Sequence, residues 1–344
     1  MKHLATVLTF LALLAPLGVR AGEKPAEKPA GKISGYMFGD YYWVAADHAD
    51  SLENQNGVWF RRIYLSYDKG LSEAFAIRFR FEASSPDFTA KSDKLNPFLK
   101  DAYLKWTRGS HNVLFGLSPS PTWERIESIW GYRSVEKTPL DLQKFGGSRD
   151  FGVAFQGALD DDKKFLYHLV IGNGTDTKSE TDKDKKLYLS LAAKPVKGAT
   201  IEVYGDWENR PADTDWLTLQ GFASYEQEKY RAGLQFVQQT RKQGAGKDDL
   251  KLALLSLFGA RQLTEKTWAF ARIDRTLDAI PGSDKIAYLP FAPAKSTLLI
   301  AGADLKPIPE VHLLPNLEMV LYSEENGVKP DTDVIPRLTV YYVF

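Results

Sequence analysis

The amino-acid sequence predicts an all-β protein, a transmembrane antiparallel β-barrel of about 16 strands. Segments of about ten residues alternate apolar with polar side chains, and successive side chains of a strand point to opposite faces of a sheet. Short polar connections between these segments alternate with long ones. The mean hydropathy is −0.31, too low for a bundle of apolar spanning helices, whereas a barrel needs only one apolar face on each strand.

The first residues of the chain carry an export pattern. A short polar start precedes an apolar run over residues 4–19, and Ala21 ends a cleavage pattern of small residues. This pattern predicts a signal peptide over residues 1–21, because a helical anchor needs about 20 apolar residues. Residues 22–32 are polar and contain repeated prolines, and we expect them to form a flexible lead. Residues 33–344 then form a single transmembrane β-barrel domain.

Sixteen segments of the chain carry the alternating pattern of a strand. Residues 75–82 are the clearest, because one face is apolar and the opposite face carries Arg78 and Arg80. The last strand ends its apolar face on Phe344. The predicted strands cover residues 33–44, 58–67, 74–83, 98–106, 113–118, 150–158, 165–172, 186–194, 200–207, 216–224, 230–239, 250–260, 267–274, 296–305, 311–322 and 334–344.

The connections between the predicted strands alternate in length. The seven short ones cover residues 68–73, 107–112, 159–164, 194–198, 225–229, 261–266 and 306–310. Residues 119–149 form the longest of the eight long ones, and both chain ends lie on the side of the short turns. This alternation predicts an even-stranded barrel with short periplasmic turns, long external loops, an apolar exterior and a polar lumen. A soluble β-sandwich is the alternative, but strands of about ten residues match the length that spans a bilayer.

The residue types present narrow the chemistry of the predicted barrel. The 44 basic and 44 acidic side chains leave no net charge, so no nucleic-acid partner is expected. The chain has no cysteine, which excludes disulfides, cysteine-ligated metals and thiol catalysis, and its five histidines lack the spacing of metal ligands. His168 lies within a predicted strand without a nucleophile or base paired with it. We therefore expect no enzyme, no cofactor and no metal site.

The candidate lumen charges come from the polar faces of the strands, where seven basic and seven acidic side chains leave no net sign. Arg62 lies on the second predicted strand, and register arithmetic places it opposite Arg78 or Arg80 on the third. Like charges that face one another need compensation from carboxylates or from permeating anions, and residues 119–149 carry such carboxylates. The predicted constriction and selectivity residues are Arg62, Arg78, Arg80, Lys105, Glu124, Glu127 and Arg133.

Five segments of the chain resemble Gram-negative outer-membrane porins, most nearly the phosphate-selective porin type. They are residues 59–82, 101–106, 114–124, 148–157 and 338–344. The resemblance implies a homotrimer of barrels in the outer membrane of a Gram-negative bacterium, with residues 119–149 as a long third external loop folded into the lumen. A terminal aromatic residue on an alternating apolar face, here Phe344 with Tyr342 and Val340, resembles the signal read by the barrel-assembly machinery.

The sequence thus predicts an outer-membrane porin, a water-filled channel for the passive diffusion of small hydrophilic solutes, with a weak anion preference as a further expectation. A substrate-selective channel for phosphate or another oxyanion is the first alternative. A non-conducting barrel that serves as an adhesin or an outer-membrane enzyme is the alternative of another class. The expected partners are outer-membrane lipids, small hydrophilic or anionic solutes, the barrel-assembly machinery and further copies of the chain in a homotrimer.

Overall fold

The computed structural model describes residues 30–85, 95–285 and 290–344. The predicted signal peptide, residues 1–21, lies outside the described residues, as does most of the predicted lead, residues 22–32. In the described part of the chain, no helix combines the length and the apolar character needed to cross a membrane.

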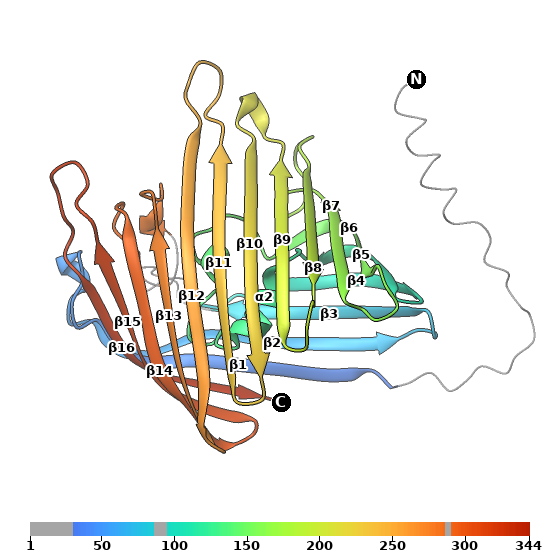
Figure 1. The fold of residues 1–344 in the computed structure, drawn as a ribbon, viewed down its shortest axis with the longest axis horizontal. Helices are drawn as coiled ribbons and strands as arrows, with labels where there is room; N and C mark the ends of the chain where they lie inside the picture. The colour runs from blue at the N-terminus through green and yellow to red at the C-terminus, as the bar shows by residue number, and fades with distance from the viewer. Residues whose placement is uncertain (1–29, 86–94, 286–289) are drawn as a thin grey trace, which may run out of the picture.

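Sixteen antiparallel strands of the described residues close into a single barrel (Figure 1). Each strand pairs with its neighbours in the sequence, and β1 pairs with β16 to complete the ring. The predicted fold class is therefore confirmed, and each predicted strand overlaps an observed one. The strands are β1 (Lys32–Trp43), β2 (Asn56–Gly70), β3 (Phe75–Ser84), β4 (Phe98–Arg108), β5 (His111–Pro119), β6 (Arg149–Ala158), β7 (Phe165–Gly172), β8 (Lys186–Ala193), β9 (Ala199–Glu208), β10 (Trp216–Gln227), β11 (Tyr230–Arg241), β12 (Leu250–Thr264), β13 (Thr267–Thr276), β14 (Ser296–Ile308), β15 (Val311–Tyr322) and β16 (Asp333–Val343).

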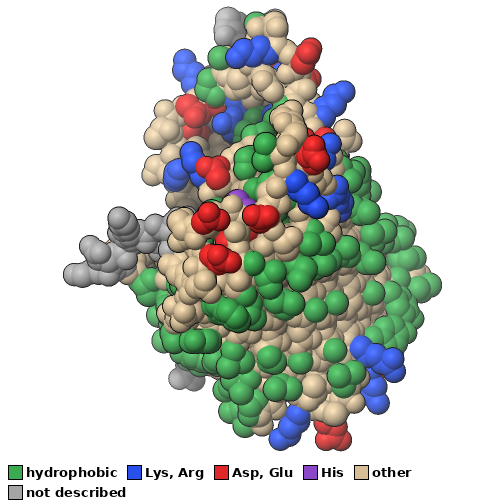
Figure 2. All heavy atoms as spheres, turned by 90° about the vertical axis from the view of Figure 1, so that its left-hand side faces the viewer, with side chains coloured by type: hydrophobic (Ala, Val, Ile, Leu, Met, Phe, Trp, Pro, Cys, Tyr) green, Lys and Arg blue, Asp and Glu red, His purple; other side chains and the backbone are tan. Residues whose placement is uncertain are grey.

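The outer surface of the barrel is apolar over a broad band. Along β11, Leu234 and Phe236 point outward and are exposed. The alternate residues Gln235, Val237 and Gln239 point inward and are buried. Figure 2 shows hydrophobic side chains over the wall of the barrel, with charged side chains gathered at the top and at the lower rim. An apolar band between charged rims is typical of a barrel that spans a bilayer.

The strand pairings of the described residues contain four register shifts, and two of these β-bulges break the alternation of inward and outward side chains at consecutive charged residues. The register between β1 and β2 shifts by one residue, which leaves Arg61 as an extra residue beside Arg62. The register between β3 and β4 shifts in the same way, which leaves Lys100 beside Asp101. An extra residue lets two consecutive side chains take the same face. As a result both members of each pair are turned to the interior, where their side chains are 14% exposed or less.

The connection between β5 and β6 lies inside the barrel and carries two helices, α2 (Trp123–Trp130) and α3 (Pro139–Leu142). Figure 1 places α2 within the outline of the strands. Its two tryptophans are almost completely buried against the inner wall: Trp123 contacts Tyr204 of β9, and Trp130 contacts Phe258 of β12 and Phe270 of β13. Two buried apolar clusters thus join this connection to the inner faces of strands between β5 and β15, and we refer to residues 120–148 as the inner loop.

The opposite wall holds the inner loop through hydrogen bonds to its backbone. The Arg61 guanidinium donates at 2.8 Å to the carbonyl oxygens of Ser134 and Val135, and Arg337 of β16 donates to Val135 at 3.2 Å. Arg61 is also paired with Asp40 of β1, with 3.3 Å between the charged atoms. These bonds supply donors for buried carbonyl groups that would otherwise be costly to bury.

The seam between the first and last strands ends at the chain terminus. Gly35 and Phe344 exchange two backbone hydrogen bonds, each 2.9 Å long, while the Phe344 ring lies on the outer surface. A Cβ atom at Gly35 would lie 2.4 Å from that ring and 2.4 Å from the backbone carbonyl oxygen of Tyr64, and because the backbone cannot give way the close approach requires glycine. Phe344 therefore closes the barrel as well as ending its apolar face.

Deletion of Phe344 should lower the folded yield of the barrel far more than Val343→Thr, which keeps the backbone pairing. The deletion removes two closing hydrogen bonds, worth about 2 kcal/mol together, along with an exposed aromatic ring. The measurement is the fraction of protein in outer membranes whose gel migration changes on boiling. Equal folded fractions for the two variants would contradict the role assigned to Phe344, and with it the predicted assembly signal of Phe344, Tyr342 and Val340.

Candidate functional site

A polar cavity of about 380 Å³ lies between the inner loop and the inner faces of β1 to β4. Its charged lining consists of Arg62, Arg80, Lys100, Arg133, Lys137 and Arg149, together with Glu124, Glu127 and Asp141. Six cations against three carboxylates give the lining a positive surplus. We call this cavity the inner cavity.

A second cavity of about 360 Å³, the outer cavity, lies at the end of the barrel that carries the long connections. It adds Lys144, Lys186 and Arg210 to the lining on the basic side, and Asp176 and Glu208 on the acidic side. The two cavities meet at residues that line both of them: Lys100, Lys137, Asp141, Ser148 and Arg149. Three of these five residues are cations and one is an anion, so the meeting point is also positive.

Two cations share the buried carboxylate of Glu82 on the inner wall. Arg62 lies 2.9 Å from one oxygen of Glu82, and Lys100 lies 3.2 Å from the other. Arg62 also donates to the hydroxyl of Tyr64, at 3.0 Å, so its guanidinium is held on two sides. Glu82 is only 2% exposed, whereas both cations line the inner cavity. The carboxylate thus lies behind the cations and orients them toward the cavity.

The same arrangement recurs one strand further along the wall. Asp101 is completely buried and is shared by Arg80, 3.4 Å away, and Arg149, which donates a hydrogen bond to it. Arg149 also donates to Glu124 of the inner loop at 2.8 Å, and Arg80 donates to the hydroxyl of Ser66 at 2.9 Å. In both groups two cations share one buried carboxylate; the Glu82 group keeps one positive charge in surplus, whereas Glu124 balances the second cation of the Asp101 group.

The inner loop contributes a third group of charges on the other side of the cavity. Arg133 lies 3.0 Å from Glu127 and 3.7 Å from Asp141. Burial raises the pKa of Glu127, and the neighbouring Arg133 lowers it only in part. Burial also acts to raise the pKa of Asp141, but Lys137 and Arg133 outweigh it, so this pKa lies below its usual value. Glu127 is therefore the first of the two carboxylates to take up a proton as the pH falls.

Five of the seven predicted selectivity residues line the inner cavity: Arg62, Arg80, Glu124, Glu127 and Arg133. The other two line neither the inner nor the outer cavity. Arg78 is paired with Asp68 at 2.7 Å, and Lys105 lies near the short turn between β4 and β5. Both residues lie in the parts of their strands that are next to the short turns, away from the two cavities.

The predicted register of the second and third strands is wrong. Arg62 lies opposite Ser84, not opposite Arg78 or Arg80, because β2 continues to Gly70 and begins pairing there with Ala76. The longer hairpin moves Arg62 toward the long connections. It also brings the carboxylate of Glu82 within ion-pair distance of Arg62. Arg62 is thus separated from Arg78 and Arg80, and Glu82 compensates its charge.

Sequence reasoning missed three charged residues of the cavity lining, Lys100, Asp141 and Arg149, and did not include Lys137 of the loop among the selectivity residues. Lys100 enters the lumen only through the bulge, and strict alternation assigns it to the lipid face. Arg149 begins β6, one residue before the predicted start of that strand. Lys137 and Asp141 belong to the inner loop, whose shape no periodic pattern reveals.

Known proteins resemble this chain in structure only. No family profile matches it, and neither does any curated protein sequence. The anion-selective porin from Comamonas acidovorans aligns with a TM-score of 0.69 at 12% identity, over 92% of this chain and 100% of that chain. OmpF of Salmonella typhi, in complex with daunomycin, gives 0.66 at 10% identity over 92% and 100%. OmpT of Vibrio cholerae, an outer membrane protein in trimer form, gives 0.65 at 11% identity over 92% and 99%.

These alignments establish that the chain has the fold of outer-membrane porins. The narrower resemblance to phosphate-selective porins stays a prediction.

Replacement of Asp101 by Asn should destabilise the barrel by roughly 3 kcal/mol, because it leaves Arg80 and Arg149 without their shared buried counter-charge. Urea unfolding of the refolded protein, followed by gel migration without boiling, measures the change. Asp162→Asn is the matched control, since the carboxylate of Asp162 is 70% exposed and pairs only with Lys164 at the surface; it should change stability by less than about 0.5 kcal/mol. Similar losses for both variants would show that the shared carboxylate does not stabilise the wall.

Proposed function

We propose that the protein is an outer-membrane porin, a water-filled channel for the passive diffusion of small hydrophilic solutes that favours anions over cations. The observation that carries this proposal is the positive surplus where the two cavities meet. There Lys100, Lys137 and Arg149 line both cavities together with Asp141, while Glu82 and Asp101, which pair with Lys100 and Arg149, lie buried behind them in the wall. A solute that passes from the outer to the inner cavity passes these side chains.

The local surplus outweighs the neutral composition of the whole chain for two physical reasons. A narrow polar passage with low-dielectric walls focuses the field of the charges that line it. The screening length at physiological salt is about 8 Å, so a charge acts mainly on ions within the same constriction. Guanidinium groups such as that of Arg149 stay protonated at any ordinary pH, which makes the positive potential permanent.

The fold supports the proposed location and assembly. The closed barrel, the apolar outer band and the charged rims suit an outer membrane, with its lipids against the exterior. The similar Comamonas acidovorans protein is an anion-selective porin, and the similar Vibrio cholerae protein was obtained as a trimer. By analogy we propose a homotrimer, inserted by the barrel-assembly machinery and without enzymatic activity.

A channel selective for phosphate or another oxyanion is the second candidate. The inner cavity presents the guanidinium groups of Arg80, Arg133 and Arg149, and their planar forks match the geometry of oxyanions. The two candidates differ in one measurement. Phosphate added to one side should block chloride current in a selective channel and leave it nearly unchanged in a general porin.

Conductance in planar lipid bilayers tests the proposal directly. The purified protein should form open channels, and reversal potentials in asymmetric potassium chloride should show a preference for chloride. A protein that inserts without conductance would instead support the non-conducting barrel, that is, an adhesin or an enzyme. Reversal potentials that show a preference for potassium would overturn the proposed selectivity.

Lys137→Glu should shift the channel toward cation preference. The change alters the constriction by two unit charges, and at about 8 Å in water this changes the energy of a monovalent ion by about 1 kcal/mol, on the order of fivefold in its local occupancy. Lys105→Glu is the matched control, because Lys105 lines neither cavity. Reversal potentials in low and high salt measure both variants, and the effect should be stronger in low salt. Equal shifts for the two variants would place the constriction elsewhere.

Mild acidification should strengthen the anion preference. The raised pKa of Glu127 means that this carboxylate takes up a proton at a higher pH than an ordinary glutamate, while the cations around it keep their charge, so the lining becomes more positive as the pH falls. Reversal potentials at neutral and at mildly acidic pH measure the change. Glu127→Gln should favour anions already at neutral pH and should remove most of the pH dependence. A pH dependence of undiminished size in that variant would assign the titration to another group.

A further inference from the structure

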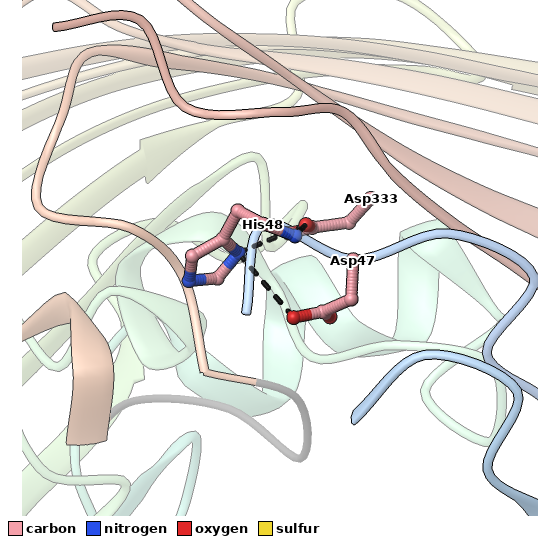
Figure 3. A group of neighbouring side chains, drawn as sticks. All are labelled: Asp47, His48 and Asp333. Carbon is pink, nitrogen blue, oxygen red and sulfur yellow. Dashed lines mark hydrogen bonds and ion pairs between the residues drawn. The ribbon is translucent and has the colours of Figure 1, made fainter. Parts of the chain in front are cut away.

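Three polar side chains outside the candidate pore converge at the end of the barrel that carries the long connections. Asp47 and His48 follow β1, and Asp333 is the first residue of β16, 285 positions from His48 (Figure 3). The His48 Nδ1 atom lies 2.9 Å from Asp333 Oδ1 and 3.7 Å from Asp47 Oδ1. Backbone pairing of Ala46 with Val334 holds the two segments in this position.

The two carboxylates of this group are buried without a matching positive charge. Asp333 is completely buried, and Asp47 is 5% exposed. One oxygen of Asp47 accepts a hydrogen bond from the backbone of Ala49, and its other oxygen has no hydrogen-bond partner among the described residues. Figure 3 shows the Asp47 carboxylate turned toward the His48 ring. A buried carboxylate oxygen without a partner is costly, and a bound cation is one way to satisfy it.

The charges near Asp47 sharpen this imbalance. The groups that act on it are Asp333, His48 and Glu53, which are two further acids and one imidazole. Protonated histidine supplies a single positive charge for the two buried carboxylates, and neutral histidine supplies none. A divalent ion would balance both carboxylates at once.

We propose that Asp47, His48 and Asp333 form a binding site for a divalent transition-metal ion of the Zn²⁺ type. Zn²⁺ binds imidazole nitrogen and carboxylate oxygen at about 2.0–2.2 Å, which places tetrahedral ligand atoms about 3.4 Å apart. The two separations from His48 Nδ1 lie on either side of this value: 2.9 Å to Asp333 Oδ1, which is a hydrogen bond without the ion, and 3.7 Å to Asp47 Oδ1, whose neighbour Oδ2 is the unpartnered oxygen. All three candidate ligand atoms lie within 4.8 Å of one another. The imidazole favours a transition metal over Ca²⁺ or Mg²⁺, which prefer oxygen ligands throughout.

Neighbouring groups already orient the candidate ligands. The hydroxyl of Tyr322 donates to Asp333, and the backbone nitrogen of Ala49 donates to Asp47 at 2.8 Å. Such outer contacts hold metal ligands in a productive orientation. The sequence predicts no metal site because its histidines lack the spacing of metal ligands. This group is assembled instead from segments next to the first and last strands, which lie far apart in the sequence. A bound ion would join the β1–β2 connection to β16 beside the barrel seam.

Zn²⁺ alone is the probe for the test, added to the full-length barrel refolded in detergent. Calorimetric titration should show one saturable site per chain, and Zn²⁺ should raise the thermal unfolding midpoint, with reversal by a chelator. Co²⁺ in place of Zn²⁺ should give the absorption bands of a tetrahedral complex with nitrogen and oxygen ligands. Asp47→Asn and His48→Gln should each abolish saturable binding and the Zn²⁺-dependent shift.

His312→Gln is the control variant, because His312 pairs with a single carboxylate, that of Asp304, at 2.8 Å near the short turns. It should keep full Zn²⁺ binding. Absence of a saturable site in the wild-type protein, or binding that survives both ligand variants, would overturn the proposal. Ca²⁺ that displaces Zn²⁺ at equal concentration would show an oxygen-only site and would overturn the role of His48. If the variants do not fold, the wild-type Co²⁺ spectrum still decides the question. None of these outcomes depends on conductance.

Discussion

A sixteen-stranded barrel encloses more space than its own inward side chains can fill, and the way this space is filled determines the rest of the structure. Barrels of about eight strands are packed by their own side chains, whereas barrels of about twice that number leave a lumen. Here the inner loop occupies part of the lumen. Arg61 and Arg337 bind its backbone from one wall, and Trp123 and Trp130 pack it against the other. The interior is thereby divided into a side beside β5 to β15, where apolar clusters pack against the inner loop, and a polar side beside β1 to β4.

On the polar side of the lumen, buried carboxylates neutralise the cations of the wall only in part. Glu82 and Asp101 are buried in the wall, and each is shared by two cations that face the cavity. Complete neutralisation of the wall would leave no lasting potential, and unpaired cations at this depth would cost several kcal/mol each in desolvation. Sharing one carboxylate between two cations lies between these extremes. It fixes the side chains in place and still leaves net positive charge beside the inner cavity.

The sequence was sufficient to predict the barrel because strand alternation and connection length are local properties that repeat sixteen times. The lumen is harder to predict, since it depends on register and on a loop without periodicity. Arg62 and Arg80 were found because alternation alone turns them inward. Arg78 and Lys105 share that pattern, but the hairpin pairing places them too near the short turns to line either cavity. Lys137 belongs to the inner loop, whose path depends on its packing against the inner wall of the barrel. The position of Lys137 therefore cannot be predicted from a local sequence pattern.

The bulges at Arg61–Arg62 and at Lys100–Asp101 are indicated in the sequence by a feature that strict strand alternation does not take into account. Arg61–Arg62 and Lys100–Asp101 each put two charged residues side by side within a strand, the first pair in the middle of β2 and the second near the start of β4. Strict alternation would turn one member of each pair toward lipid, where Arg or Lys near the bilayer midplane costs about 2–4 kcal/mol. The extra residue of a bulge removes this cost by turning both members inward. Consecutive charges within a predicted membrane strand therefore argue for a bulge at that point, and here both bulges bring a basic residue to the polar side of the lumen, one to hold the inner loop and one to line the cavity.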